Sequence, residues 1–316
     1  MPTPMQTKKP YWKKKMGAGN SSGAVIRSFT FRVLAPFILG GFCAGAQPDS
    51  STLDRKKLNT FIIASAAGYT AGIATLNHVW YKDTERQPFR FFNDNAEWKQ
   101  MDKAGHFFSS FYLSEIPAGV LNRYGVHERK ADLIGALSGF FLTLPIEIMD
   151  GFSDGYGASA GDLVADAAGP VVYLGQKLAW GEIRLRPKFS FHRTRYAPMR
   201  PVLLGDNLLS EIVKDYNGQT YWLSVDVDRF ITFPEWLNFA IGYGAHDMVY
   251  ARDHQNEGGG FNPYRQYYLA VDLDLTAIKT RSPWIKTLLD VLNTVRLPAP
   301  AMEFSSNGSK FHPFYF

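Results

Sequence analysis

The sequence predicts an α+β fold, in which a helical bundle of about four main helices precedes a smaller β-rich region. Two observations predict it. Between residues 47 and 185 the apolar runs are rich in Ala, Gly and Ser and have the length of helices rather than strands. From Lys188 onward the sequence becomes aromatic, and apolar and polar residues alternate over short stretches, as in half-buried strands. We therefore divide the chain into residues 1–46, 47–185 and 186–316.

Residues 1–46 have the features of a signal peptide. A basic region is followed by the apolar run VLAPFILGGFCAGA, which ends in the small-x-small triplet Ala44-Gly45-Ala46. We expect cleavage after Ala46, and the alternative is a retained N-terminal anchor. Cys43 is the only cysteine, and Phe42 stands where a lipoprotein signal has a small residue, so cleavage is favoured over lipidation. A mature chain without cysteine excludes disulfides and thiolate metal sites.

The net charge of the chain is set by this first segment. The whole sequence holds 34 Lys and Arg against 29 Asp and Glu, but residues 1–46 contribute seven basic residues and no acidic one. The remainder is slightly acidic and shows no basic stripe. A nucleic-acid partner is therefore not expected.

Four segments of residues 47–185 are predicted to be helical. The first, 59–80, is rich in small residues that suit close helix contacts. The others run from about 100 to 122, from 131 to 149 with Pro145 as a kink, and from about 162 to 180, capped by Ser159 or Asp162. These apolar runs are short for a bilayer, which needs about 20 residues. The sequence predicts membrane association but does not decide between spanning and lying in the interface.

The C-terminal region is predicted to contain four to six short strands and one amphipathic helix. The clearest strands are 220–227 and 267–275, with a weaker one at 239–245, and the helix covers 282–295. The terminal FHPFYF resembles the end of an outer-membrane barrel, but such a barrel needs at least eight strands. We expect a sheet packed on the bundle or on a partner. Its strand acids, Asp226, Asp272 and Asp274, are expected to face solvent.

Three of the predicted helices each carry a short polar stripe on an apolar body. The pairs Asp102 and His106, and Asp162 and Asp166, are four residues apart, so each pair shares one helix face. The sequence Glu147-Ile-Met-Asp150 adds a pair three residues apart. Ionisable groups inside such helices are costly and usually mark a functional site. We expect the three stripes to face one another.

Three uses of this cluster remain open. The first is a divalent metal site, because carboxylates and imidazole suit such ions. The second is general acid–base catalysis by His106 with a carboxylate, for which Glu147 and Asp162 are the candidates. The third, which is favoured, is a structural network in which Lys103, His106 and serines satisfy the acids. The candidate metal ligands are Asp102, His106, Glu147, Asp150, Asp162 and Asp166.

The same residues carry a family resemblance. The pattern Asp102-Lys103-Ala-Gly-His106, then Glu147-Ile-Met-Asp150, then Ser159-Ala-Gly-Asp162-Leu-Val-Ala-Asp166-Ala-Ala-Gly169 resembles the YfiM-like predicted periplasmic lipoproteins, which have no established function. It is more distantly similar to the VanZ-like membrane proteins, which typically have Gln at the position of Asp150 and Asn at that of Asp166. The resemblance covers about residues 95–180. It implies an envelope protein with a helical, membrane-associated module, and it supplies no reaction.

The function predicted from these observations is that of an exported cell-envelope protein of structural or interaction type. Its expected partners are membrane lipid and, through the C-terminal region, other envelope proteins. Its expected place is the periplasmic side of the outer membrane. One alternative is a hydrolase or transferase that acts on a lipid or lipid-linked substrate. Another is a multi-pass, VanZ-like protein of the inner membrane.

Overall fold

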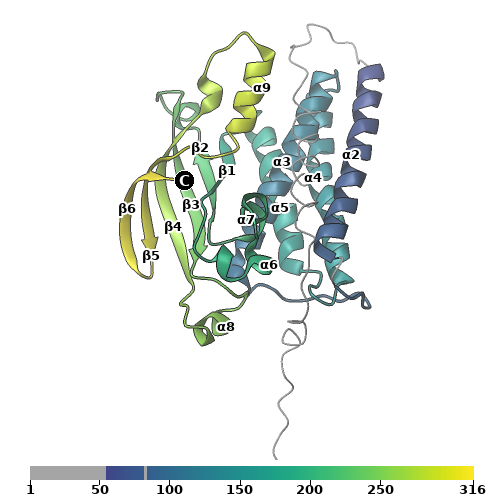
Figure 1. Cartoon of the computed structure of the whole chain (residues 1–316). Coiled ribbons are helices and arrows are strands. Elements are labelled where there is room, and N and C mark those ends of the chain that lie inside the picture. The colour runs from purple at the N-terminus through teal and green to yellow at the C-terminus, as the bar shows by residue number, and fades with distance from the viewer. Residues whose placement is uncertain (1–54, 82–83) are drawn as a thin grey trace, which may run out of the picture.

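The computed structural model describes residues 55–81 and 84–316 of the chain. The predicted signal peptide lies outside them. Four long helices come first and stand side by side (Figure 1), followed by a six-stranded antiparallel sheet, so the α+β prediction is confirmed. The long helices are α2 (Arg55–Tyr81), α3 (Met101–Arg123), α4 (Glu128–Gly151) and α5 (Ala160–Trp180).

The sheet is a simple meander in which each strand pairs with its neighbour in sequence, in the order β1 to β6. Shorter helices lie in the connections between strands, and α9 is the amphipathic helix that the sequence predicts. The strands are β1 (Leu185–Phe191), β2 (Gln219–Val225), β3 (Leu237–His246), β4 (Tyr264–Leu273), β5 (Ala299–Ser305) and β6 (Gly308–Tyr315). The helices are α6 (Pro201–Leu204), α7 (Leu208–Lys214), α8 (Asp253–Gly258) and α9 (Pro283–Leu292).

Small residues bring α3, α4 and α5 close together. A Cβ atom at Gly139 of α4 would overlap Ser114 of α3, and one at Gly169 of α5 would overlap Ser110 and the backbone of Phe107. A buried cluster that includes Phe111 fills the space beyond these contacts. Because no side chain separates the helix backbones at the glycines, polar groups on facing helices lie within hydrogen-bonding reach. Pro145 does not end α4, which continues to Gly151.

Helix α3 joins the bundle to the sheet. The hydroxyl of Tyr112 donates a hydrogen bond of 2.6 Å to the carbonyl of Pro187 in β1, and Nη1 of Arg186 donates to both carboxylate oxygens of Glu115 at 2.8 and 2.9 Å. The ring of Phe108 lies 6.0 Å from the ring of Phe189. One face of the sheet is therefore partly covered by α3.

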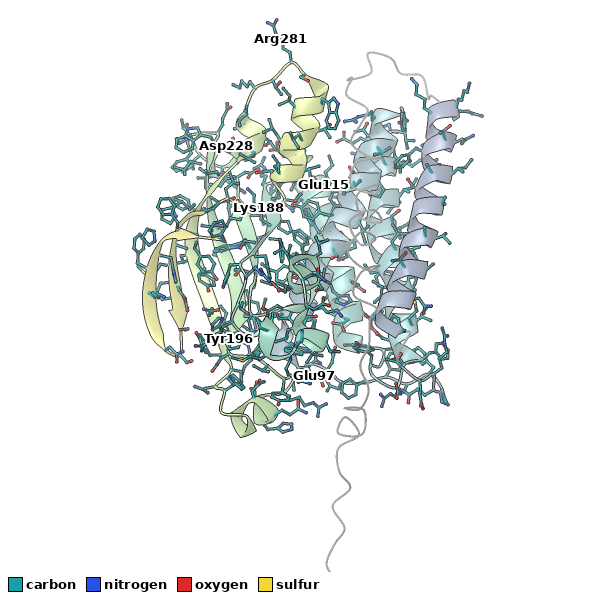
Figure 2. The ribbon with its side chains drawn as sticks, viewed as in Figure 1. Glu97, Glu115, Lys188, Tyr196, Asp228 and Arg281 are labelled. Carbon is teal, nitrogen blue, oxygen red and sulfur yellow. The ribbon has the colours of Figure 1, made fainter. Side chains whose placement is uncertain are left out.

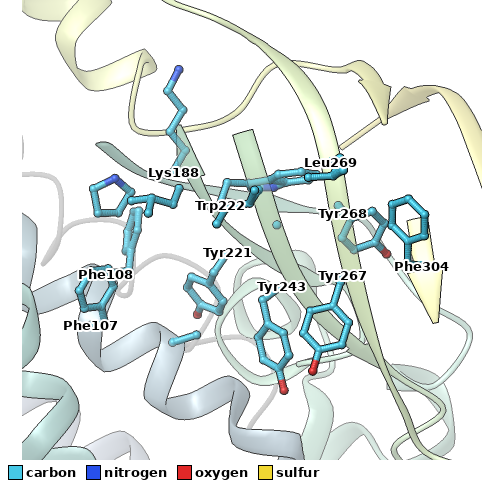
Figure 3. Close-up of a pocket in the computed structure, with 15 residues that line it drawn as sticks. Phe107, Phe108, Lys188, Tyr221, Trp222, Tyr243, Tyr267, Tyr268, Leu269 and Phe304 are labelled. Atoms are coloured by element: carbon cyan, nitrogen blue, oxygen red, sulfur yellow. The ribbon is translucent and has the colours of Figure 1, made fainter. Parts of the chain in front are cut away.

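The uncovered part of that face is apolar. Ile241 and Leu269 are more than half exposed there, and Tyr243 and Tyr267 lie beside them. A cavity of about 450 Å³ opens between this face and α3, lined chiefly by aromatic side chains such as Phe108 (Figure 3).

The opposite face of the sheet is enclosed, and it combines a buried hydrophobic cluster around Trp222 and Tyr268 with buried polar groups. Lys188 of β1 and Asp272 of β4 form an ion pair of 2.7 Å, and both side chains are buried. Ser224 donates a further hydrogen bond of 2.6 Å to Asp272. Asp226 and Asp274 are only partly exposed, and Asp226 accepts a hydrogen bond from Asn238. The prediction that the strand acids face solvent is therefore wrong for Asp272, because alternation gives the period of a strand and not the side that is enclosed.

The bundle also exposes apolar side chains. Leu133, Leu137 and Phe141 of α4 and Val164 and Val171 of α5 are at least half exposed. Among the helices of the described chain, α4 alone is long and apolar enough to cross a membrane, and a third of its most apolar stretch is buried. The inner-membrane alternative needs three or four such helices, so this one helix gives it little support.

Candidate functional site

The three polar stripes meet at one end of the bundle, where α3 begins, α4 ends and α5 begins. Ser159 organises this junction as the N-cap of α5. Its hydroxyl oxygen accepts a hydrogen bond of 3.1 Å from the backbone N–H of Asp162 and donates one of 2.6 Å to Asp94. Its backbone N–H donates to Glu147 Oε2 at 2.9 Å. The helix cap therefore fixes an acid of α4 and an acid of the preceding connector at the same time.

A first group of side chains consists of His106, Glu147 and Asp166. His106 Nδ1 lies 3.0 Å from Asp166 Oδ1, and His106 Nε2 lies 3.9 Å from Glu147 Oε1. The two acid side chains are 2% exposed or less, and the imidazole is 21% exposed. The histidine is thus the part of this group that solvent reaches.

A second group surrounds Lys103. Its Nζ atom lies 2.8 Å from Asp94, 3.1 Å from Asp102 and 3.0 Å from Asp162. A Cβ atom at Gly161 would overlap the side chains of Asn95 and Lys103, so a larger residue at this position would require both side chains to move.

Asp150 belongs to neither group. It accepts a hydrogen bond of 2.7 Å from the hydroxyl of Tyr81, at the end of α2. The structure therefore brings all six predicted residues to one end of the bundle but divides them between two groups and a separate acid. The groups are His106, Glu147 and Asp166, and Asp94, Asp102 and Asp162.

Two contributors lie outside the predicted stripes, namely Asp94 and Tyr81. Asp94 lies in the connector between α2 and α3, which is held beside the site by backbone hydrogen bonds such as Phe92 N–H to the carbonyl of Ala158, 2.9 Å. Its only signal in the sequence is an acid in a polar stretch before α3. Tyr81 ends α2, and its position depends on how α2 packs beside α4, which spacing along the chain does not give.

Burial and the crowding of charges change the pKa values of the first group. Burial by itself lowers the pKa of His106, but its hydrogen bond to Asp166 and the charges of Asp166, Asp162 and Glu147 raise that pKa to about 9. Burial raises the pKa of Glu147 to about 7, against the hydrogen bond from Ser159 and the charge of His106. These shifts favour the cationic form of His106 and the protonated form of Glu147, so a metal ion bound by this group would have to displace both protons.

The pKa values of the acids near Lys103 shift in different directions. Burial raises the pKa of Asp162 to about 6, although the charges of His106 and Lys103 oppose it. Burial also raises the pKa of Asp102. For Asp94 burial is outweighed by hydrogen bonds from Lys103 and Ser159, which lower its pKa. Asp150 behaves like Asp162, because burial raises its pKa to about 6.

At this site three buried carboxylate oxygens accept no hydrogen bond from the described residues. They are Asp102 Oδ1, Glu147 Oε1 and Asp166 Oδ2. An unpartnered buried acceptor costs about 1–3 kcal/mol, and more when charged. The buried ion pair of Lys188 and Asp272 leaves one such oxygen, Asp272 Oδ1, whereas this site leaves three. The site as a whole places six acids around Lys103 and His106. Its negative charge and its orphan oxygens are the features that a bound cation would compensate.

The first group offers two neighbouring ligand atoms that could hold a metal ion. Two ligand atoms about 2.1 Å from one ion lie at most ~4.2 Å apart, and His106 Nε2 and Glu147 Oε1 satisfy this limit. Asp166 would then act through the other ring nitrogen. In many metal sites a carboxylate holds the second nitrogen of a ligating histidine and so fixes its orientation.

Comparison with known proteins gives one match. No curated protein and no solved structure matches the chain significantly. Residues 90–174 match the profile of a family described as a predicted periplasmic lipoprotein (DUF2279). The matched stretch is about a quarter of the chain and contains α3, α4, most of α5 and both groups of the site. The match agrees with a YfiM-like lipoprotein at a coarse level and lends no support to the VanZ-like resemblance. It supports an exported protein of the cell envelope, similar over this stretch to a predicted periplasmic lipoprotein family.

Proposed function

We propose that the protein is an exported envelope protein, on the periplasmic side of the outer membrane, whose helical bundle binds a divalent cation. His106 Nε2 and Glu147 Oε1 are the proposed ligands, and Asp166 orients the imidazole. One observation carries the proposal: Glu147 Oε1 is buried without a hydrogen-bond partner among the described residues and faces the histidine nitrogen 3.9 Å away. A mixed imidazole and carboxylate set favours a first-row ion such as Zn²⁺ or Mn²⁺ over Ca²⁺.

The second group is less suited to a metal. Lys103 Nζ lies among Asp94, Asp102 and Asp162 at 2.8–3.1 Å, and therefore already supplies a positive charge at the centre of these acids. The ammonium group and a metal ion would compete for the same oxygens. We assign this group to the structural network that the sequence favours, and the group of His106 to the ligand.

Metal content tests the proposal. The mature protein is purified without chelator beside His106→Ala and Glu147→Gln, with Asp253→Asn as the control, because Asp253 is a half-exposed acid on α8 whose side chain pairs with Lys99. We expect near-stoichiometric metal in the wild type and in the control, and loss from both site variants. Circular dichroism confirms that each variant is folded.

The contrary result is equally clear. If the wild type holds no metal and takes up neither Zn²⁺ nor Mn²⁺ at millimolar concentration, the cation proposal fails. His106 and Glu147 are then part of the structural network, and both substitutions lower stability without changing metal content.

A second candidate function is hydrolysis or group transfer on a lipid-linked envelope substrate. The observation that favours it is the pKa of Glu147, raised to about 7 beside a histidine that an aspartate orients. A carboxylate that titrates near the working pH is suited to move a proton to or from a substrate. Turnover of a lipid-linked substrate that is lost in Glu147→Gln, with metal content retained, would support this function over simple cation binding.

A further inference from the structure

The end of the molecule opposite the cation site is unusually rich in exposed tryptophan. Of the five tryptophans whose side chains the structure describes, Trp180, Trp236 and Trp284 are the exposed ones, at 39%, 56% and 60%. They belong to the end of α5, the β2–β3 connection and the start of α9. Three separate parts of the chain thus each bring one tryptophan to this end.

Direct contacts show that these parts are neighbours. The ring of Trp180 lies 5.7 Å from that of Phe230 in the β2–β3 connection. Glu235 of the same connection forms an ion pair of 3.4 Å with Lys279, just before α9. In Figure 2 Asp228 and Arg281 mark this end, and Glu97 marks the end where the site lies. We call this end the aromatic tip, and define it by Trp180, Phe230, Ile231, Trp236, Ile278 and Trp284.

Basic side chains surround the aromatic tip. The guanidinium group of Arg184 lies 5.1 Å from the rings of both Trp180 and Phe230. Arg229, Lys279, Arg281 and Lys286 are exposed around it. The acids of the same segments, such as Glu182 and Glu235, are paired with Arg184, Arg229 and Lys279. Asp228 also pairs with Arg229, so among the described side chains of the tip Arg281 and Lys286 are the basic ones that form no ion pair, and these two place positive charge beside the aromatic rings.

We propose that the aromatic tip docks the protein onto the surface of an anionic lipid bilayer. Tryptophan is enriched at the membrane–water interface, where its apolar ring and its N–H group each find a suitable environment. Arginine and lysine beside it are attracted by negative headgroups, each by roughly a fivefold gain in affinity near such a surface. The proposal goes beyond the cation site, because it assigns a second surface at the other end of the molecule.

The distribution of exposed apolar residues favours lipid over a protein partner. From the tip they continue along α9, through Ile285, Leu288 and Leu292, and onto the sheet through Phe239 and Ile241. A protein interface has a buried core that is surrounded by a polar rim. An apolar surface that passes around several sides of one end, with cations among the rings, fits a fluid bilayer that can surround it.

Vesicle binding by the mature protein tests the proposal. Co-sedimentation is measured with vesicles of pure phosphatidylcholine and of phosphatidylcholine with 30% phosphatidylglycerol. We expect Trp236→Ser/Trp284→Ser to bind the anionic vesicles at least tenfold more weakly than the wild type. Arg281→Glu/Lys286→Glu should lose binding to the anionic vesicles to a similar extent. Met199→Ser/Val202→Ser is the matched control, because Val202 of α6 and Met199 just before it are exposed apolar residues away from the tip.

Two further measurements separate this proposal from its competitors. Bromine-labelled acyl chains should quench the tryptophan fluorescence of the wild type in anionic vesicles, and His106→Ala should bind vesicles as the wild type does, whatever its metal content. The proposal is overturned if the wild type binds neither vesicle, or if the tip variants bind as well as the control. A dimer in sedimentation velocity that the tryptophan variant abolishes would also overturn it, since the tip would then be a protein interface.

Discussion

Replacing Lys103 by methionine is the sharpest test of how the acidic end of the bundle is held together. Lys103 is 13% exposed and lies within 3.1 Å of three carboxylates. Methionine keeps most of the length and apolar volume of the side chain but removes the charge. Without the lysine charge, three carboxylates repel one another, namely those of Asp94, Asp102 and Asp162. Their oxygens lie within 4.8 Å of one another.

The expected cost follows from that geometry. Two unit charges 4.8 Å apart at an effective dielectric constant of about 20 repel by ~3.5 kcal/mol, and removing one partner of a buried ion pair typically costs about 3–5 kcal/mol. We expect the free energy of unfolding of Lys103→Met to be lower than that of the wild type by about 3–5 kcal/mol at pH 7.5. At roughly 2–4 °C per kcal/mol for a domain of 150–250 residues, this lowers Tm by about 6–20 °C.

The cost should depend on pH in a definite direction. In the variant the crowded carboxylates have pKa values above those of the unfolded chain, so the folded state binds more protons as the pH falls. The difference in free energy of unfolding between Lys103→Met and the wild type should therefore become smaller as the pH is lowered from 7.5 to 5. Urea unfolding in EDTA at both pH values measures this. Lys279→Met is the control, because Lys279 and Glu235 form an exposed pair, and such pairs contribute at most about 1 kcal/mol.

Either of two results would refute this reasoning. A loss below about 1 kcal/mol at pH 7.5 would mean that the three acids do not depend on the ammonium group. A gap that widens as the pH falls would mean that the carboxylates are stabilised in their charged form by something other than Lys103.

Three further predictions concern the fold, and each is checked by urea unfolding. Gly169→Ala should lower the free energy of unfolding by about 1–3 kcal/mol, because the new Cβ atom would overlap α3. Gly175→Ala in the same helix has open space around the new Cβ atom and should raise the free energy of unfolding by about 0.5–1 kcal/mol. Equal effects of the two substitutions would contradict the close packing at Gly169. Asp226→Asn should raise the free energy of unfolding by on the order of 2 kcal/mol at pH 8, because burial raises the folded pKa of Asp226 to about 6, above the unfolded value near 3.9. This gain should decrease as the pH falls through 6 and vanish near pH 4. A gain that does not depend on pH would contradict the prediction. Lys188→Met should lower the free energy of unfolding by about 3–5 kcal/mol, because it leaves the buried charge of Asp272 without its partner. Adding Asp272→Asn should restore much of this stability. A double variant as unstable as Lys188→Met alone would exclude a buried-charge penalty.

The fold class could be predicted from periodicity, but the orientation of the sheet could not. The strand around residues 267–275 alternates clearly, and the structure has a strand there, Tyr264–Leu273. Alternation does not say which set of residues faces inward. Asp272 is buried because Lys188, far away in sequence, supplies its partner, and Leu269 is exposed because α3 covers only part of the sheet.

The candidate site shows the same division. Spacing within each helix placed Asp102 beside His106 and Asp162 beside Asp166, since residues four apart share a helix face. The sorting into two groups depends on side-chain reach and on how the helices are offset along their axes. Asp94 depends on the path of a connector that is held by long-range backbone hydrogen bonds. The spacing of residues along the chain predicts neither the division into two groups nor the position of Asp94.

Helix α3 runs from the proposed cation site to the opposite end of the bundle and so sets a distance between the two proposed surfaces. His106 lies in its second turn and Arg123 at its last residue, which at ~1.5 Å per residue puts them roughly 25 Å apart along the axis. A protein standing on the bilayer by its aromatic tip would hold His106 well above the headgroups, facing the aqueous compartment. The proposed metal site would then be accessible to soluble ligands or long envelope polymers. It would not contact the lipids to which the tip is bound.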